Sequence, residues 1–191
     1  MGPTTATALT AADIDYVRTS YVTLADLGPE HATWIGVMLP LPTYRLADGT
    51  SYFPRDWARL AVDAGSAAST RGLFARRYHA AAAALGEPDQ LAVAWQAYLA
   101  GLYGACLREV TPENIVAKAR LVARLDRALA CPAPDQLAWC ATLRADVEAL
   151  DGISRPFATC DRIRFGRPTS RERLITDVRE RYPHAFLDHS T

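Results

Sequence analysis

The sequence predicts a mainly α-helical protein, a compact helical bundle built around a buried central helix. The stretch from Leu91 to Leu107 carries this prediction, because Gln96 is its only strongly polar side chain and a helix that is apolar all round must be buried all round. Half of the 191 residues are apolar, which is enough for a core that needs no disulfide or metal. Helix caps and breakers recur along the chain, as at Thr111, which precedes a proline at the first helical position.

Residues 1–65 are predicted to form an N-terminal arm and a winged-helix-like segment. Thr10 is typical of a helix N-cap, with an acidic residue three positions later. Thr23 caps a second short helix, which Gly28 ends, and a proline then begins a third helix over 29–38. Two short helices separated by one turn are typical of a helix-turn-helix.

A small β-hairpin is expected directly after these helices. Residues 43–46 and 51–53 have strand character, and they flank a loop that contains Asp48 and Gly49. Pro54 ends the hairpin, and a further helix is expected after it.

Several residues of this region carry a resemblance to a known family. They are TLADL, Leu39-Pro40, Tyr44, Asp48-Gly49, Tyr52, Asp56 and Leu60. In this pattern the segment from Tyr21 to Leu60 resembles the helix-turn-helix and wing of the MerR-type regulators. The resemblance implies that the second short helix enters the DNA major groove and that the wing contacts phosphates. The candidate DNA-binding residues on this interpretation are His31, Thr33, Trp34 and Arg45.

The charge of the same segment argues against DNA binding. Residues 21–57 contain two arginines against four acidic residues, a net charge of −2, whereas a protein that reads DNA presents positive charge. The expected recognition helix also lacks the Arg or Lys that would contact guanines and phosphates. Over the whole chain, 21 basic residues balance 21 acidic ones, which argues against binding to nucleic acid or membrane through the overall field, so any such role would have to be local.

Residues 66–191 are predicted to form the helical bundle, packed with the N-terminal segment as one unit. Its expected helices are 71–85 closed by Gly86, the central helix 91–107, 112–130, 135–150 closed by Gly152, and a last helix from Thr169 to about Tyr182. Prolines and glycines cut this region into short helices, as a compact bundle requires.

Three aromatic residues of the central helix, Trp95, Tyr98 and Tyr103, are candidate substrate-binding residues. Gly101 and Gly104 leave space beside them, so the rings can form the wall of a ligand pocket. The same residues are equally typical of an ordinary core. Both interpretations stay open from the sequence.

The last stretch, residues 153–183, carries eight arginines against four acidic residues, a net charge of +4. Arg162, Arg164 and Arg167 precede a capping box that begins at Thr169, and a helix N-terminus beside guanidinium groups is a good anion site. These three arginines are therefore candidate substrate-binding residues. The alternative is that they pair with acidic residues of other helices and hold the tail in place.

Candidate catalytic residues are few, because no nucleotide-binding, metalloprotease or hydrolase motif is present. His79 is a candidate general base, and Asp161 among arginines is a candidate for orienting a substrate. Their alternative roles are a lone surface or core histidine and a structural salt bridge. Four cysteines at uneven spacings fit no zinc or redox template, and we expect no metal and no redox cofactor.

The segments YVTLADL, LPLPTYRLADGTSYFPRDW and PTSRERLITDVRERYP, together with the chain length, resemble a bacterial family of natural-product biosynthesis proteins of unknown function. The resemblance implies a role beside the genes that build secondary metabolites. The N-terminus lacks a secretory signal, so we place the protein in the cytoplasm. Our leading hypothesis is a protein that binds a small, partly apolar and partly anionic substrate or biosynthetic intermediate, either as a cofactor-independent acid/base enzyme or as an accessory subunit. The alternative is a transcriptional regulator or a protein-interaction module that uses the winged helix.

Overall fold

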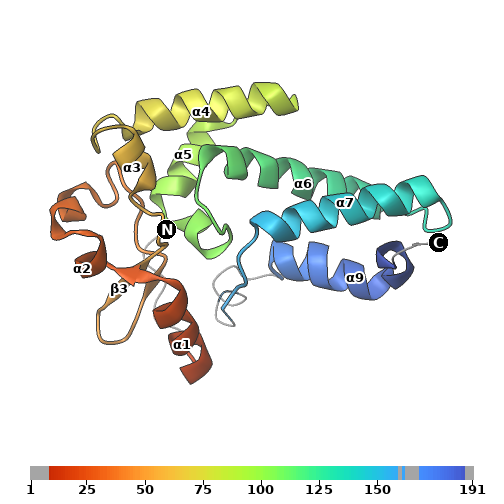
Figure 1. Cartoon of the computed structure of the whole chain (residues 1–191), viewed down its shortest axis with the longest axis horizontal. Coiled ribbons are helices and arrows are strands. Elements are labelled where there is room, and N and C mark those ends of the chain that lie inside the picture. The colour runs from red at the N-terminus through yellow and green to blue at the C-terminus, as the bar shows by residue number, and fades with distance from the viewer. Residues whose placement is uncertain (1–8, 159–160, 162–167, 188–191) are drawn as a thin grey trace.

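Figure 1 shows a computed structural model of the chain, which describes residues 9–158, 161 and 168–187, without the side chains of residues 27 and 29–31. Its α-helices are α1 (Ala11–Ser20), α2 (Leu24–Leu27), α3 (Arg59–Asp63), α4 (Thr70–Leu85), α5 (Leu91–Leu99), α6 (Pro112–Ala130), α7 (Leu137–Ile153) and α9 (Asp177–Arg181). Shorter helical turns are the 3-10 helices η1 (Pro29–Trp34), η2 (Leu102–Ala105) and η4 (Pro183–Phe186) and the π-helical segment η3 (Glu172–Thr176). The strands are β1 (Val22–Thr23), β2 (Tyr44–Arg45) and β3 (Ser51–Phe53). The predicted mainly helical class is thus confirmed.

The three strands form one antiparallel sheet in the order β1-β3-β2. The predicted hairpin is present as β2 and β3, with Tyr44 opposite Tyr52, and β1 pairs on the other side of β3 with Val22 opposite Phe53. Gly49 has a φ of +85° in the turn, a conformation that favours glycine over other residues. The sheet lies beside α1 and α2 at the N-terminal end of the molecule (Figure 1).

The third helix of the N-terminal part, predicted over 29–38, is shorter in the structure. It is a 3-10 helix that ends at Trp34, and Gly36 then turns the chain with a φ of +76°. The backbone N–H groups of Met38 and Leu39 donate to the carbonyl of Trp34, at 3.0 Å each, so they close the turn instead of extending a helix. A proline at the first helical position therefore started a helix that the following glycine ended early.

The bundle is organised around α6, which packs against α4 on one side and α7 on the other (Figure 1). The predicted bounds of α6 are confirmed, and the side chain of Thr111 accepts from the N–H of Asn114 at 3.2 Å. Gly86 ends α4 in the left-handed conformation, as expected. By contrast, α7 continues through Gly152 to Ile153, three residues beyond the predicted end.

The predicted central helix 91–107 is shorter than expected and is not buried all round. It ends at Leu99, because Gly101 adopts a φ of +70° and the chain continues as the 3-10 helix η2. One side faces solvent, where Val93 is 69% exposed, and the opposite side is buried in the core. The prediction from composition was wrong here, because alanine and valine are compatible with partial exposure.

Hydrogen bonds cross the predicted boundary between residues 65 and 66. The N–H of Leu41 donates to the carbonyl of Leu99 at 2.8 Å, and the hydroxyl of Tyr21 donates to the carbonyl of Gly104 at 3.0 Å. These bonds hold the loop before β2 and the end of α1 against α5 and η2.

The C-terminal helix is held against the bundle by ion pairs. Asp151 on α7 pairs with Arg171 at 2.5 Å and with Arg179 at 2.9 Å. The predicted capping box is present, since the hydroxyl of Thr169 accepts from the N–H of Glu172 at 3.2 Å. Within residues 9–158, 161 and 168–187, no helix combines the length and the apolar character that a bilayer span requires.

Candidate functional site

The aromatic residues of the predicted central helix lie in a packed cluster. Trp95 and Tyr98 are 5% and 2% exposed, and their ring centroids are 5.3 Å apart. The ring centroid of Phe74 on α4 lies 5.2 Å from that of Trp95 and 5.1 Å from that of Tyr98. Tyr103 packs against the same cluster, and burial raises its pKa to about 12. The rings are thus surrounded mainly by other side chains of the core.

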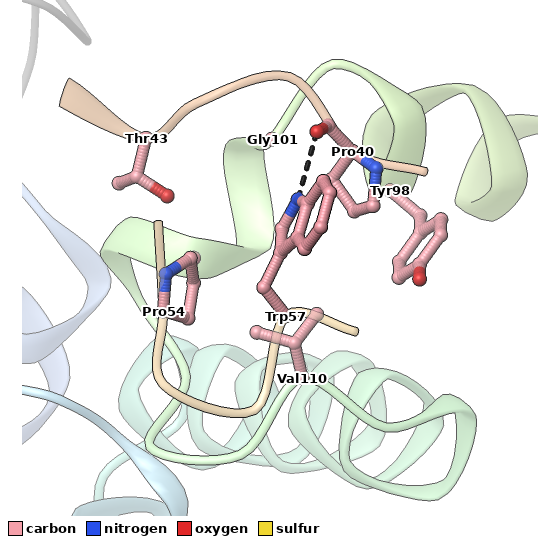
Figure 2. A pocket seen from close by; sticks show the side chains of 8 residues that line it. Pro40, Thr43, Pro54, Trp57, Tyr98, Gly101 and Val110 are labelled. Atoms are coloured by element: carbon pink, nitrogen blue, oxygen red, sulfur yellow. Dashed lines mark hydrogen bonds between the residues drawn. The ribbon is translucent and has the colours of Figure 1, made fainter. Parts of the chain in front are cut away.

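A small cavity adjoins the ring of Tyr98 (Figure 2). Its lining comes from both parts of the chain and consists of Pro40, Thr43, Pro54, Trp57, Tyr98, Gly101, Gly104 and Val110. The volume is about 10 Å³, which is room for about one water molecule. The indole N–H of Trp57 donates to the carbonyl of Pro40 at 2.8 Å and closes one side, as Figure 2 shows. A substrate of ordinary size does not fit in this cavity.

Two buried oxygen atoms near this cavity make no hydrogen bond among the described residues: the Tyr98 hydroxyl oxygen and Oδ1 of Asp56. The other oxygen of Asp56, Oδ2, accepts from the N–H of Val110 at 2.5 Å. Burial raises the pKa of Asp56 above its usual range, against the lowering effects of the Val110 hydrogen bond and of Arg155. Burial also raises the pKa of Tyr98, with a further contribution from the negative charge of Asp56. The charge of this carboxyl therefore acts on the phenol inside the protein.

Asp161, a predicted catalytic residue, is fully buried beside the N-terminal sheet. Its Oδ2 accepts from the hydroxyl of Tyr44 at 2.7 Å and from the N–H of Ala158 at 3.0 Å. The ring of Tyr21 meets that of Tyr44 edge-on at 4.9 Å, and the guanidinium of Arg155 lies over Tyr21 at 4.7 Å. Burial raises the pKa of Tyr44, and the charge of Asp161 raises it further. The structure therefore places this carboxylate in a cluster of tyrosines that joins the sheet to the bundle.

The other predicted catalytic residue, His79, is on the exposed face of α4. Its side chain is 52% exposed, and its nearest acidic partner is Asp89, with 3.9 Å between Nδ1 and Oδ2. The two predicted catalytic residues thus belong to separate surroundings. The predicted anion-binding residues Arg162, Arg164 and Arg167 lie outside the described residues.

The residues of the DNA-binding alternative lie on the N-terminal part of the chain. Thr33 and Trp34 are exposed at the end of η1, and the side chain of His31 is outside the description. Arg45 is exposed on β2, and its Nε donates to the hydroxyl of Ser51 at 3.3 Å.

A larger concavity, which the sequence reasoning missed, lies on the bundle between the end of α4, the second half of α6, and α7. We call it the α6 groove, and its volume is about 300 Å³, within the range of small-molecule sites. Its charged lining residues are Arg120, Arg124, Arg127, Glu87 and Asp146. The three arginines follow the helical spacing of four and three residues, so they share one face of α6. This spacing was a signal in the sequence, but the acidic residues come from other helices.

The arginines of the α6 groove differ in how they are neutralised. Nε of Arg124 forms an ion pair with Oδ2 of Asp146 at 2.9 Å. Arg120 donates to the carbonyl of Leu85 at 2.5 Å, and this neutral acceptor leaves its charge in place. Among the described residues, Arg127 has no hydrogen-bond or ion-pair partner, and neither does the side chain of Glu87. Two guanidinium charges therefore face the groove without a carboxylate partner.

The fold and this site define a mainly helical protein with an arginine-lined groove on its bundle. The chain belongs to a family of unknown function, DUF6058, whose model matches residues 70–183, more than half of the chain. No curated protein and no solved structure matches the chain. Within the described ranges, no three His, Cys, Asp or Glu side chains gather as a metal site requires.

Proposed function

We propose that this protein binds a small anionic molecule in the α6 groove. The observation that carries the proposal is the presence of two arginines, Arg120 and Arg127, that line the groove without a carboxylate partner among the described residues. A carboxylate or a phosphate fits the fork geometry of a guanidinium and would neutralise this excess charge.

The lining of the groove also suits a molecule with an apolar part. Leu85 and Ala128 contribute apolar surface beside the arginines, whose own methylene stems are apolar as well. Arg124 is fixed by its ion pair with Asp146, and the side chain of Asp146 is only 11% exposed. The groove therefore offers one guanidinium that is already oriented between two that are available to a ligand.

The groove is a better candidate than the cavity beside Tyr98, because it is about thirty times larger in volume. Binding is proposed here as the role of the groove, either in an enzyme or in an accessory subunit. The role in natural-product biosynthesis and the DNA-binding alternative both stay predictions from the sequence.

The test is a titration of the protein with inorganic phosphate and with hexanoate, followed by amide chemical shifts and by calorimetry. Arg127→Ala should lower the affinity for both ligands by about five- to tenfold, which is the effect of losing one charged hydrogen bond that is partly screened by solvent. The matched control is Arg71→Ala, which removes an exposed arginine of α4 that does not line the groove.

Binding should also weaken as the ionic strength rises, because exposed charges are screened. Shift changes confined to α6, α7 and the end of α4 would support the proposal. Equal affinities for the wild-type protein and the Arg127→Ala variant would refute it, and so would shift changes elsewhere in the chain.

A further inference from the structure

We infer that the ligand of the α6 groove carries a positively charged amine as well as its anionic group, so that it is a zwitterion similar to an amino acid. This inference rests on the proposed function of the groove and specifies the chemical class of its ligand. It follows from Glu87, a carboxylate that lines the groove together with the arginines but pairs with none of them.

Glu87 is held in position by the end of α4. Its backbone N–H donates to the carbonyl of Ala82 at 2.9 Å, and Gly86 before it donates to Ala83 at 3.2 Å, which together fix the turn that follows the helix. The side chain is partly buried, and within the described part of the chain it has no hydrogen-bond partner. A carboxylate in this position is available to a cation that arrives from solution.

The end of α4 adds to the preference for a cation at this side of the groove. The carbonyl groups of the last helical turn carry partial negative charge, which favours positive groups near a helix C-terminus. Arg120 already donates to one of these carbonyls, that of Leu85. Glu87 is a second acceptor at the same end, and it carries a full charge.

The opposite side of the groove is suited to the anionic group. Arg127 lies seven residues after Arg120 on α6, which corresponds to about 10 Å along the helix axis. Arg124 lies between them and is turned toward α7 by Asp146. A ligand of moderate length can therefore place its anion near Arg127 and its amine near Glu87.

The same arrangement leaves only a small excess of positive charge in the groove. Three arginines and two acidic residues line the groove, so its net charge is only +1. Glu87 weakens the attraction of the groove for an anion alone, whereas a zwitterion would form an ion pair at each end. Glu87 thus favours a ligand with charges of both signs.

The test compares pairs of ligands that differ only in the amine: γ-aminobutyrate with butyrate, and ε-aminohexanoate with hexanoate. Affinities are measured by calorimetry at low ionic strength for the wild-type protein and for Glu87→Gln. The wild-type protein should bind at least one amino compound about fivefold more tightly than its matched carboxylate, the effect of one exposed ion pair. In Glu87→Gln the two members of that pair should bind equally.

Two measurements keep this test independent of the proposed function. Glu148→Gln is the matched control, because Glu148 is exposed on α7 and does not line the groove, so this variant should keep the preference for the amine. Butyrate and hexanoate should bind to Glu87→Gln at least as tightly as to the wild-type protein, since a repelling charge is removed. If the carboxylates bind through Arg127 but the amine brings no advantage, the inference is overturned and the proposed function stands. If neither the carboxylates nor the amino compounds bind, both are overturned.

Discussion

Replacing Gly104 by alanine tests how closely the N-terminal part packs against η2. A Cβ atom at this position would lie 2.8 Å from Cγ of Pro54 and closer still to Oγ1 of Thr43. Both neighbours belong to the segment around the hairpin, so the new methyl group would push this segment away from the bundle. Overpacking of this kind costs about 1 to 3 kcal/mol in unfolding free energy.

The expected decrease can be measured by thermal unfolding and by urea titration. For a protein of this size, 1 kcal/mol lowers Tm by about 2 to 4 °C, so Gly104→Ala should lower Tm by roughly 2 to 12 °C. The single change Gly101→Ala should destabilise the protein more than Gly104→Ala does. Its φ is +70°, which costs about 1 to 2 kcal/mol for alanine, and its Cβ would meet the backbone carbonyl of Leu41, which has little freedom to move.

The matched control is Gly152→Ala in α7, where a Cβ meets nothing within 4 Å and the φ is not positive. This change should stabilise the protein by about 0.5 to 1 kcal/mol, because alanine has the higher helix propensity. Thr43→Ala in the Gly104→Ala background should cost less than the sum of the two single changes, since the closest atom is then absent. A Gly104→Ala variant as stable as the wild type would refute the packing argument.

Three further predictions concern carboxyl groups. Burial alone would raise the pKa of Asp151, but its hydrogen bonds to Arg171 and Arg179 outweigh this effect and lower the pKa. The contribution of the ionised carboxylate to stability is therefore present above the unfolded pKa of about 4 and is lost as the pH falls through the folded pKa. In urea unfolding from pH 6 to pH 2, the unfolding free energy of Asp151→Asn should decrease less on acidification than that of the wild-type protein; an equal decrease would contradict this. Burial raises the pKa of Asp56, so its effect on stability has the opposite sign: stability falls as the pH rises from about 4 through the folded pKa. In the same assay, Asp56→Asn should remove that fall, and a fall that persists in the variant would contradict the assignment. Asp146→Ala leaves its arginine on α6 unpaired and should lower the unfolding free energy by about 1 to 3 kcal/mol in urea; no change would mean the pair contributes nothing.

Local signals in the sequence predicted the elements that depend on a few neighbouring residues. The bounds of α6 followed from Thr111 and the proline after it, and the turn at Gly49 followed from its position between two strand-like segments. The end of α5 was missed for a tertiary reason. Gly101 adopts a left-handed conformation against the carbonyl of Leu41, a residue sixty positions away, and no local pattern indicates this contact.

The candidate site was less predictable than the fold, because its charges are paired across long distances in the sequence. Arg124 is neutralised by Asp146 of α7, whereas Arg127 has no partner among the described residues, and both look alike in the sequence as polar positions of one helix. Asp161 accepts a hydrogen bond from Tyr44, which precedes it by 117 residues, and no local pattern in the sequence indicates this contact. Which charges are free for a ligand is therefore decided by the packing of the helices.

The sequence predicted a ligand site beside the aromatic residues of α5, whereas the proposed site is the α6 groove, and the packing of the side chains accounts for the difference. Trp95 and Tyr98 stack on each other and pack against Phe74 of α4, so their surface is already occupied by protein. Among the described residues, the guanidinium groups of Arg120 and Arg127 have no carboxylate partner, so the free energy of neutralising them is available to a ligand. All residues that line the α6 groove also lie within 70–183, the part of the chain that matches the family model. Binding in the groove is therefore a proposal about the segment that defines the family, and it can be tested without reference to the N-terminal sheet.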